Sequence, residues 1–165
     1  MLHFDYANVF LSFPPEIATL LIAMLPIAEL RAALPIALTV FHLPVVSALI
    51  WSIVGNLMPA ILLLHILKPL AAFLEKHIQI GHRFFTWLSH RTENKFVSNK
   101  LKYGSFIALM LFVAIPLPIT GAWTGALAAY LTGISFKRAV LAISLGVLIA
   151  ATIVLILTEG ITSIL

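Results

Sequence analysis

Apolar residues fill four long stretches of the chain, and polar residues gather between them. The stretches cover residues 17–41, 43–64, 103–131 and 139–158. A membrane-spanning helix needs about 20 predominantly apolar residues. The second and fourth stretches have this length and contain no Asp, Glu, Lys or Arg. Each of them therefore predicts one transmembrane helix.

The first and third stretches predict broken helices. A continuous helix over residues 103–131 would be about 43 Å long, which exceeds the roughly 30 Å thickness of a bilayer's hydrocarbon core. Pro116 and Pro118 interrupt this stretch, and proline breaks helices because it has no backbone N–H. We expect two half-helices of about 10–12 residues that each reach the middle of the bilayer. The first stretch contains Pro26 and Pro35, and we expect it to behave in the same way.

Basic residues are distributed unevenly along the connections. Residues 68–102 contain seven Lys or Arg and two Glu, Lys137 and Arg138 precede the fourth stretch, and residues 1–16 contain no Lys or Arg. Basic connections favour the cytoplasmic side of a membrane. Both basic clusters can be cytoplasmic only if residues 103–133 enter and leave the membrane on the same side, which predicts a re-entrant hairpin. The alternative is four full crossings that place Lys137 and Arg138 outside.

The two halves of the chain repeat the same order of features. Residues 17–67 and 103–158 each combine a proline-broken stretch, a short connection and a span with a mid-span glycine, Gly55 or Gly146. Because the halves would start on opposite sides, they predict an inverted repeat, a recurring design of transporters. Between them, apolar residues at near-helical spacing in 68–102 predict an amphipathic helix in the cytoplasmic interface. A plain topology signal would explain the same charges.

The predicted fold is therefore a single membrane domain over residues 1–165. It is all-α, with two re-entrant hairpins and two transmembrane helices in an inverted repeat, and a cytoplasmic amphipathic helix. The composition agrees, since 62% of the residues are apolar, 10% are charged and the mean hydropathy is +1.12. Average soluble domains are about 45–50% apolar and about 25% charged. We expect an integral membrane protein.

Several chemistries are disfavoured by what the sequence lacks. There is no cysteine, which excludes thiol catalysis, disulfides and Cys-ligated metals. The six histidines are scattered without the spacing of a metal site, and no nucleotide-binding loop or hydrolase motif is present. We therefore expect a protein that is not an enzyme and that has no cofactor, no metal and no nucleic-acid partner.

Glu29 and Arg31 are the charged residues inside an apolar stretch. A charge in the bilayer costs several kcal/mol unless it is paired, hydrated or used. Glu29 could carry a proton, and the planar fork of Arg31 could bind a phosphate or carboxylate. Residues two apart lie on different faces of a regular helix, so a turn between Pro26 and Pro35 is needed to aim both into one cavity. An ion pair that fixes this turn is the structural alternative.

A second group of candidates surrounds the break in the third stretch. Freed carbonyls, threonine hydroxyls and the positive end of the second half-helix could all face a polar ligand or anion there. Close helix packing through Gly121 and Gly125 is the alternative. Asn56 could line the same cavity or form an interhelical hydrogen bond. The candidate binding residues are Glu29, Arg31, Asn56, Pro116, Pro118, Thr120, Gly121, Trp123 and Thr124.

Three segments resemble the small multidrug export protein family of bacteria and archaea. They are residues 26–35, the Gly55-Asn56 pair with Pro59, and residues 112–126, and the resemblance extends over about residues 15–160. More distantly, the chain is similar to the DedA superfamily, which implies two re-entrant hairpins, inverted symmetry and proton-dependent movement of lipid carriers. The resemblance implies that the binding residues are Glu29, Arg31, Pro116, Pro118, Thr120, Gly121 and Trp123. Ile119 replaces the family's usual glycine, and the second arginine-rich motif of DedA proteins is missing.

We therefore expect a small, multi-pass secondary transporter of the inner (cytoplasmic) membrane. It would be proton-coupled and would move a lipid or amphipathic compound through a cavity where the two hairpins meet. Export of small amphipathic drugs is one alternative, and a non-transporting assembly or lipid-organising protein is another. The expected partners are membrane lipids, the substrate and protons. The small enclosed volume would suit a homo-oligomer such as a dimer.

Overall fold

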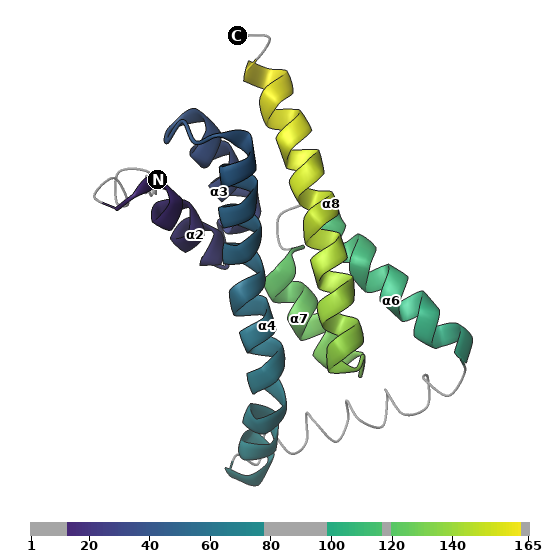
Figure 1. Cartoon of the computed structure of the whole chain (residues 1–165). Coiled ribbons are helices and arrows are strands. Elements are labelled where there is room, and N and C mark those ends of the chain that lie inside the picture. Colours follow the sequence, from purple (N-terminus) through teal and green to yellow (C-terminus); the bar gives the residue numbers. More distant parts are fainter. Residues whose placement is uncertain (1–12, 78–98, 117–119, 163–165) are drawn as a thin grey trace, which may run out of the picture.

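The computed structural model describes residues 13–77, 99–116 and 120–162. These residues form helices and no strands, which confirms the predicted all-α class (Figure 1). The helices are α2 (Pro15–Met24), α3 (Glu29–Thr39), α4 (Val45–His77), α6 (Asn99–Ala114), α7 (Ala122–Leu131) and α8 (Phe136–Thr162).

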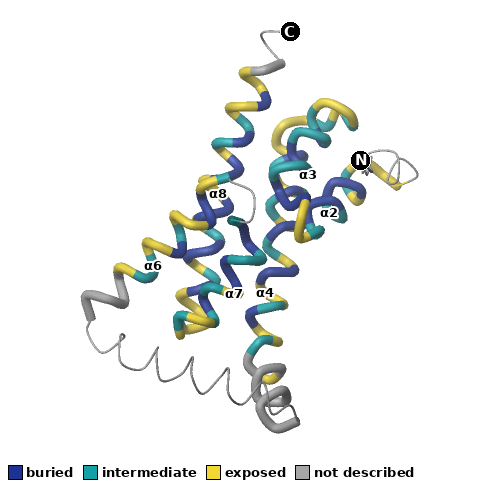
Figure 2. The backbone as a smooth tube through the Cα atoms, turned by 180° about the vertical axis from the view of Figure 1, so that it is seen from behind, coloured by how far each residue is buried: buried dark blue, intermediate teal, exposed yellow. Residues whose placement is uncertain are grey.

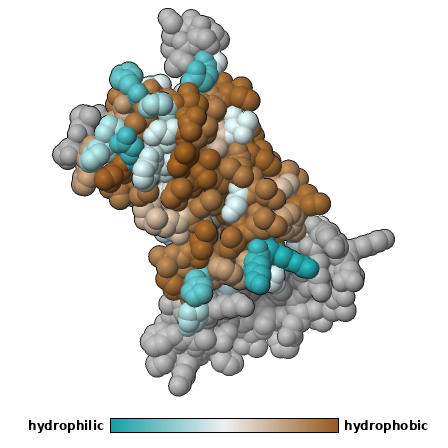
Figure 3. Space-filling model, in the orientation of Figure 1, coloured by the Kyte–Doolittle hydropathy of each residue, from teal (hydrophilic) through white to brown (hydrophobic). Residues whose placement is uncertain are grey.

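Two of these helices are long and apolar enough to cross a membrane. The candidate spans are Val45–Leu67 in α4 and Phe136–Gly160 in α8, which matches the two predicted transmembrane helices. Large apolar side chains on both helices are exposed, among them Val46 at 69% and Ile156 at 65%. Figure 3 shows an apolar band across the middle of the visible face, with hydrophilic residues nearer the two ends. This surface suits contact with lipid tails.

The four shorter helices form two hairpins. Helices α2 and α3 are joined by residues 25–28 and form a hairpin in the upper part of the molecule, and α6 and α7 form a second hairpin in the lower part (Figure 1). Both predicted breaks are therefore present. The first turn lies at the start of the predicted interval between Pro26 and Pro35, and Pro35 itself lies inside α3. The chain turns around Pro26 and becomes helical again at Glu29, before Pro35 is reached.

Each hairpin packs between the two long helices. Helix α2 lies against α4 and α6 lies against α8, while α3 also reaches α8 and α7 reaches α4. The buried residues face this shared centre (Figure 2). Many of them are alanines, and the largest buried apolar side chains include Leu30, Leu34, Val113 and Ile143. The small side chains let the helix backbones approach closely.

Gly55 and Gly146 are points where a long helix and a hairpin helix approach closely. A Cβ atom at Gly55 would lie 2.5 Å from the Leu20 carbonyl oxygen and 2.8 Å from the Ala23 Cβ in α2. A Cβ atom at Gly146 would lie 2.7 Å from the carbonyl oxygen of Met110 and 2.7 Å from the Cβ of Val113 in α6. Both long helices thus use a mid-span glycine to receive the first helix of the preceding hairpin.

The predicted amphipathic helix over 68–102 is only partly covered by the structure. Residues 68–77 continue α4 and do not begin a separate helix, and residues 99–102 belong to the start of α6. Residues 78–98 lie outside the described residues. The prediction of a separate helix is therefore wrong for residues 68–77, because α4 continues through Pro69 beyond its apolar span.

Replacing either mid-span glycine should destabilise the protein. Gly55→Ala and Gly146→Ala should each lower the free energy of unfolding by about 1–3 kcal/mol, because the new methyl group overlaps the adjacent helix. Gly104→Ala and Gly160→Ala are the matched controls, since a Cβ atom at either position meets nothing within 4 Å. The measurement is SDS-induced unfolding in mixed micelles. Equal stability of all four variants would contradict this packing.

Candidate functional site

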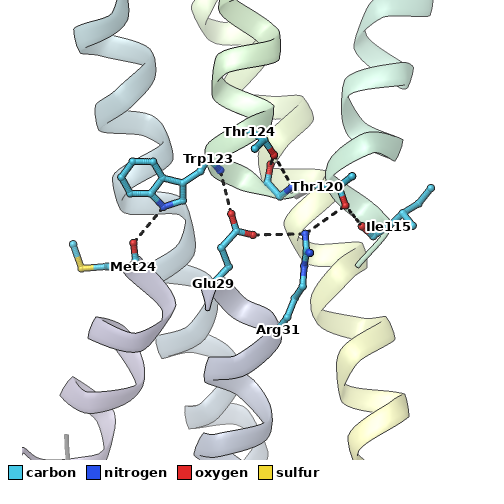
Figure 4. Close-up of polar contacts among 8 residues, drawn as sticks. Met24, Glu29, Arg31, Ile115, Thr120, Trp123 and Thr124 are labelled. Atoms are coloured by element: carbon cyan, nitrogen blue, oxygen red, sulfur yellow. Dashed lines mark hydrogen bonds and ion pairs between the residues drawn. The ribbon is translucent and has the colours of Figure 1, made fainter. Parts of the chain in front are cut away.

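The tips of the two hairpins meet at the side chain of Glu29. Glu29 is the first residue of α3 and is only 6% exposed. Its backbone has a φ of 49°, a left-handed conformation that costs about 1–3 kcal/mol for a residue other than glycine. In this position the side chain points away from α3 and toward the start of α7 (Figure 4). The strained backbone thus places a carboxylate between the hairpins.

The start of α7 receives this carboxylate. The Trp123 backbone N–H donates to the Glu29 Oε1 at 3.4 Å, and the Ala122 amide also faces the carboxylate. The first amides of a helix have no partner within the helix, and they favour negative charge. The Gly121 N–H instead donates to the Thr124 hydroxyl at 2.9 Å. The free end of α7 is therefore satisfied partly by a side chain from the other hairpin.

Gly121 leaves the space that the Glu29 carboxylate occupies. A Cβ atom at this position would overlap the carboxylate of Glu29. The glycine therefore permits the close approach of Glu29 to the helix, and the requirement here is space rather than backbone conformation.

Arg31 joins the same cluster from the first turn of α3, two residues after Glu29. Its Nη2 lies 3.7 Å from the Glu29 Oε2 and 3.5 Å from the Thr120 hydroxyl oxygen. The Thr120 hydroxyl in turn donates to the Ile115 carbonyl at 2.8 Å. Both contacts of Arg31 are long, and 24% of its side chain is exposed. Arg31 is thus only loosely held by the protein.

Trp123 connects the cluster to the first helix of the other hairpin. Its indole N–H donates to the Met24 carbonyl at 3.2 Å. Met24 is the last residue of α2, and the final carbonyls of a helix have no partner within the helix. Trp123 therefore bridges α2 through its side chain and α3 through its backbone (Figure 4). The sequence does not indicate this role of Met24, because the contact uses its backbone carbonyl, a group that every residue has.

A cavity of about 380 Å³ lies beside Arg31, between α3 and α8. Arg31 and the residues four and eight positions later lie on one face of α3. Another wall is formed by α8, and Pro116 also lines the cavity. The lining residues are Arg31, Pro35, Thr39, Pro116, Val154, Leu157 and Thr158. The contribution of α8 could not be anticipated, because its residues have the composition of an ordinary span.

The family comparison covers the part of the chain that holds this cluster. The sequence model of the family described as "Putative small multi-drug export protein" matches residues 29–153. The chain belongs to this family. The search of curated proteins and the search of solved structures found no match to the chain.

Membership of the small multi-drug export family gives a coarse function. The family description indicates a transporter, which agrees with the prediction from the sequence. Together with the two apolar helices, it also supports a membrane location. The resemblance to this family that the sequence suggested is confirmed.

The structure brings together most of the predicted binding residues. The cluster at the hairpin tips contains Glu29, Arg31, Thr120, Gly121, Trp123 and Thr124. Pro116 lines the cavity beside Arg31, and Pro118 lies outside the described residues. Asn56 is not among the cavity-lining residues. It is buried in α4, and among the described residues its Oδ1 has no hydrogen-bond partner, like the Ser52 hydroxyl one turn earlier.

A double-mutant cycle tests the contact between Glu29 and Gly121. In the native chain Gly121→Ala should reduce the free energy of unfolding by about 1–3 kcal/mol, because the methyl group displaces the carboxylate. In a Glu29→Ala background the same change should cost much less, which gives a coupling free energy above about 1 kcal/mol.

The control cycle pairs Glu29→Ala with Gly160→Ala, where a Cβ atom meets nothing within 4 Å. This pair should be additive. Additivity of the Gly121 pair as well, measured by the same SDS titration, would show that the carboxylate does not occupy the start of α7.

Proposed function

We propose that the protein is a small secondary transporter that moves an amphipathic compound or lipid in exchange for, or together with, protons. Two re-entrant hairpins enter the membrane from opposite faces, and their tips meet at the binding site. The observation that carries this proposal is the buried carboxylate of Glu29, which one hairpin inserts against the first amides of α7 in the other. Charged groups at such depth are characteristic of substrate and proton pathways.

The distribution of basic residues supports the re-entrant arrangement. The end of α4 and the starts of α6 and α8 lie at the same end of the molecule (Figure 1). The lysines and arginines of the described residues, apart from Arg31, belong to these three segments: Lys68, Lys76, Lys100, Lys102, Lys137 and Arg138. The positive-inside rule places this end in the cytoplasm. Helices α6 and α7 then start and end on the cytoplasmic side, as a re-entrant hairpin does.

The matching contacts of the two halves support an inverted repeat. Gly55 receives α2 and Gly146 receives α6 through equivalent close approaches. In addition, α3 reaches the long helix of the second half, and α7 reaches the long helix of the first half. Such an exchange between halves supports a repeat interface formed by the broken helices, as in transporters that bind their substrates at this interface.

The position of the Glu29 carboxylate supports the proposed proton coupling. Its deprotonated form is stabilised by the α7 amides and by Arg31. A proton that binds to a carboxylate oxygen removes the negative charge and weakens both attractions. The hairpin tips can then separate, and the negative charge of Glu29 no longer opposes the binding of a ligand anion at Arg31. Loss of the proton restores the contact, so protonation biases the equilibrium between two arrangements of the tips.

Export of small drugs is the second candidate within the same class, and the family description favours it. It shares the hairpins, the membrane location and the Glu29 switch with the first candidate. The two differ in the compound carried, and therefore in the chemistry of the cavity that binds it.

Cysteine labelling tests the membrane topology, since the native chain has no cysteine. We expect His42→Cys to react with a membrane-impermeant maleimide in intact cells. We expect Ser135→Cys and Gly104→Cys to react only after permeabilisation, because both ends of the second hairpin are cytoplasmic. External labelling of Ser135→Cys, with Gly104→Cys protected, would instead demonstrate four full crossings.

Transport is tested in proteoliposomes with a trapped pH indicator and two permanently charged amphiphiles, decyl sulfate and ethidium. An imposed pH gradient should drive the movement of at least one of them through the native protein. Glu29→Gln should slow this movement by about tenfold or more, because the carboxylate can no longer exchange a proton. Glu16→Gln, in the first turn of α2, is the matched control and should transport normally. A flux that persists in Glu29→Gln would refute proton coupling. A flux that persists after the pH gradient has been collapsed would refute it as well.

A further inference from the structure

We propose that the cavity between α3 and α8 binds a single-chain amphiphile through one anionic head group, which Arg31 holds. This inference rests on the proposed transport function and names the substrate class of the same site. It selects anions such as alkyl sulfates, phosphates or carboxylates over the cationic drugs that a buried carboxylate would suggest.

The first argument is the separation of the two charges. Glu29 does not line the cavity, because its carboxylate is turned toward the α7 amides and only 8% of its side chain is exposed. Arg31 does line the cavity, with 24% of its side chain exposed. Among the lining residues it is the charged one. A ligand in the cavity therefore meets a guanidinium group, while the carboxylate faces another helix.

The second argument is the unused capacity of this guanidinium. A guanidinium group has five N–H donors in a planar fork. Toward the described residues, the two contacts of Arg31 that hold it in the cluster both involve Nη2, at 3.5 Å and 3.7 Å. The remaining edge of the fork can donate two parallel hydrogen bonds to the oxygen atoms of a carboxylate, sulfate or phosphate, which is the strong bidentate geometry of arginine.

The third argument is the shape and polarity of the remaining cavity. Pro35, Val154 and Leu157 make its walls predominantly apolar beyond Arg31. From Arg31 to Thr39 the cavity follows α3 for about 12 Å, at 1.5 Å per residue. Its volume of about 380 Å³ is near the lower end of the range for ligand pockets. These dimensions suit one apolar chain behind one head group.

The direction of the cavity indicates from which face the ligand is reached. Its lining extends to the last residue of α3 and to Thr158, near the end of the α8 span. Both helix ends lie opposite the basic end of the molecule (Figure 1). Leu157 is 56% exposed, so this wall borders the lipid. Glu159 follows Thr158 but does not line the cavity. The ligand thus enters from the face away from the basic residues.

The test uses two ions with the same ten-carbon chain, decyl sulfate and decyltrimethylammonium. Radiolabelled decyl sulfate is bound to the purified full-length protein in an uncharged maltoside detergent, and binding is measured by scintillation proximity. We expect saturable binding that unlabelled decyl sulfate displaces and decyltrimethylammonium does not. Arg31→Gln should weaken it by about tenfold or more, and Arg31→Lys should lose less, because lysine keeps the charge without the fork.

Two matched controls distinguish binding in the cavity from the general effects of losing a positive charge or of adding a bulky side chain. Arg138→Gln removes an exposed arginine at the basic end and should bind normally. Leu157→Trp should block the cavity without a change of charge, whereas Ile156→Trp, at an exposed position outside the lining, should leave binding unchanged. Thermal unfolding of each variant verifies that it is folded. If Arg31→Gln does not fold, Arg31→Lys still tests the role of the guanidinium group.

Each other outcome would overturn the inference. Equal displacement by decyltrimethylammonium would show that the cavity does not select anions. Unchanged binding in Leu157→Trp would place the ligand elsewhere. Displacement by the two-chain lipid phosphatidylglycerol at equal concentration would identify a membrane lipid as the occupant and refute the single chain. None of these results affects the Glu29-dependent flux, so failure of this inference is distinguishable from failure of the transport proposal.

Discussion

The burial of one carboxylate between two hairpins is the constraint on which the rest of the structure depends. An uncompensated charge within a membrane costs several kcal/mol, so Glu29 has to be surrounded by donors. The donors come from the amides at the start of α7 and from Arg31. This requirement explains why the backbone at Glu29 adopts a left-handed conformation and why a glycine precedes α7. The hairpin tips meet because the charge of one needs the helix end of the other.

The remaining contacts are close helix packing, which stabilises proteins in a lipid environment. Lipid tails are as apolar as the side chains, so helices in a membrane gain little from hydrophobic burial and depend on close packing. Many of the fully buried residues are accordingly alanines, and Gly55 and Gly146 bring each hairpin onto a long helix at backbone distance. Such packing is similar in both halves, whereas the polar cluster is made once, at the interface between them. The cluster therefore can change state without disrupting the packing of either half.

The separation of Glu29 and Arg31 gives each residue a different role in the proposed transport cycle. The carboxylate is committed to α7, where protonation would release it, and the guanidinium is exposed to the cavity beside α8. A ligand anion at the free edge of the Arg31 guanidinium group would repel the negative charge of the Glu29 carboxylate at its Nη2. Binding of a proton to one residue and of an anion to the other is then favoured together. In the proposed cycle, this coupling would link proton movement to substrate movement through two side chains only two positions apart.

The sequence by itself determined the parts of this protein that depend on local composition and on the thickness of a bilayer. The lengths of the apolar stretches predicted the two spans, the prolines predicted the breaks, and the cost of charge in lipid singled out Glu29 and Arg31. The match to the export family was also predictable from local segments. The tertiary structure decided where the Glu29 side chain points, that Pro35 lies inside a helix rather than at the turn, and that α8 forms one wall of a cavity. These features depend on a single left-handed residue and on contacts between residues about 90 positions apart, for which the composition of either segment carries no signal.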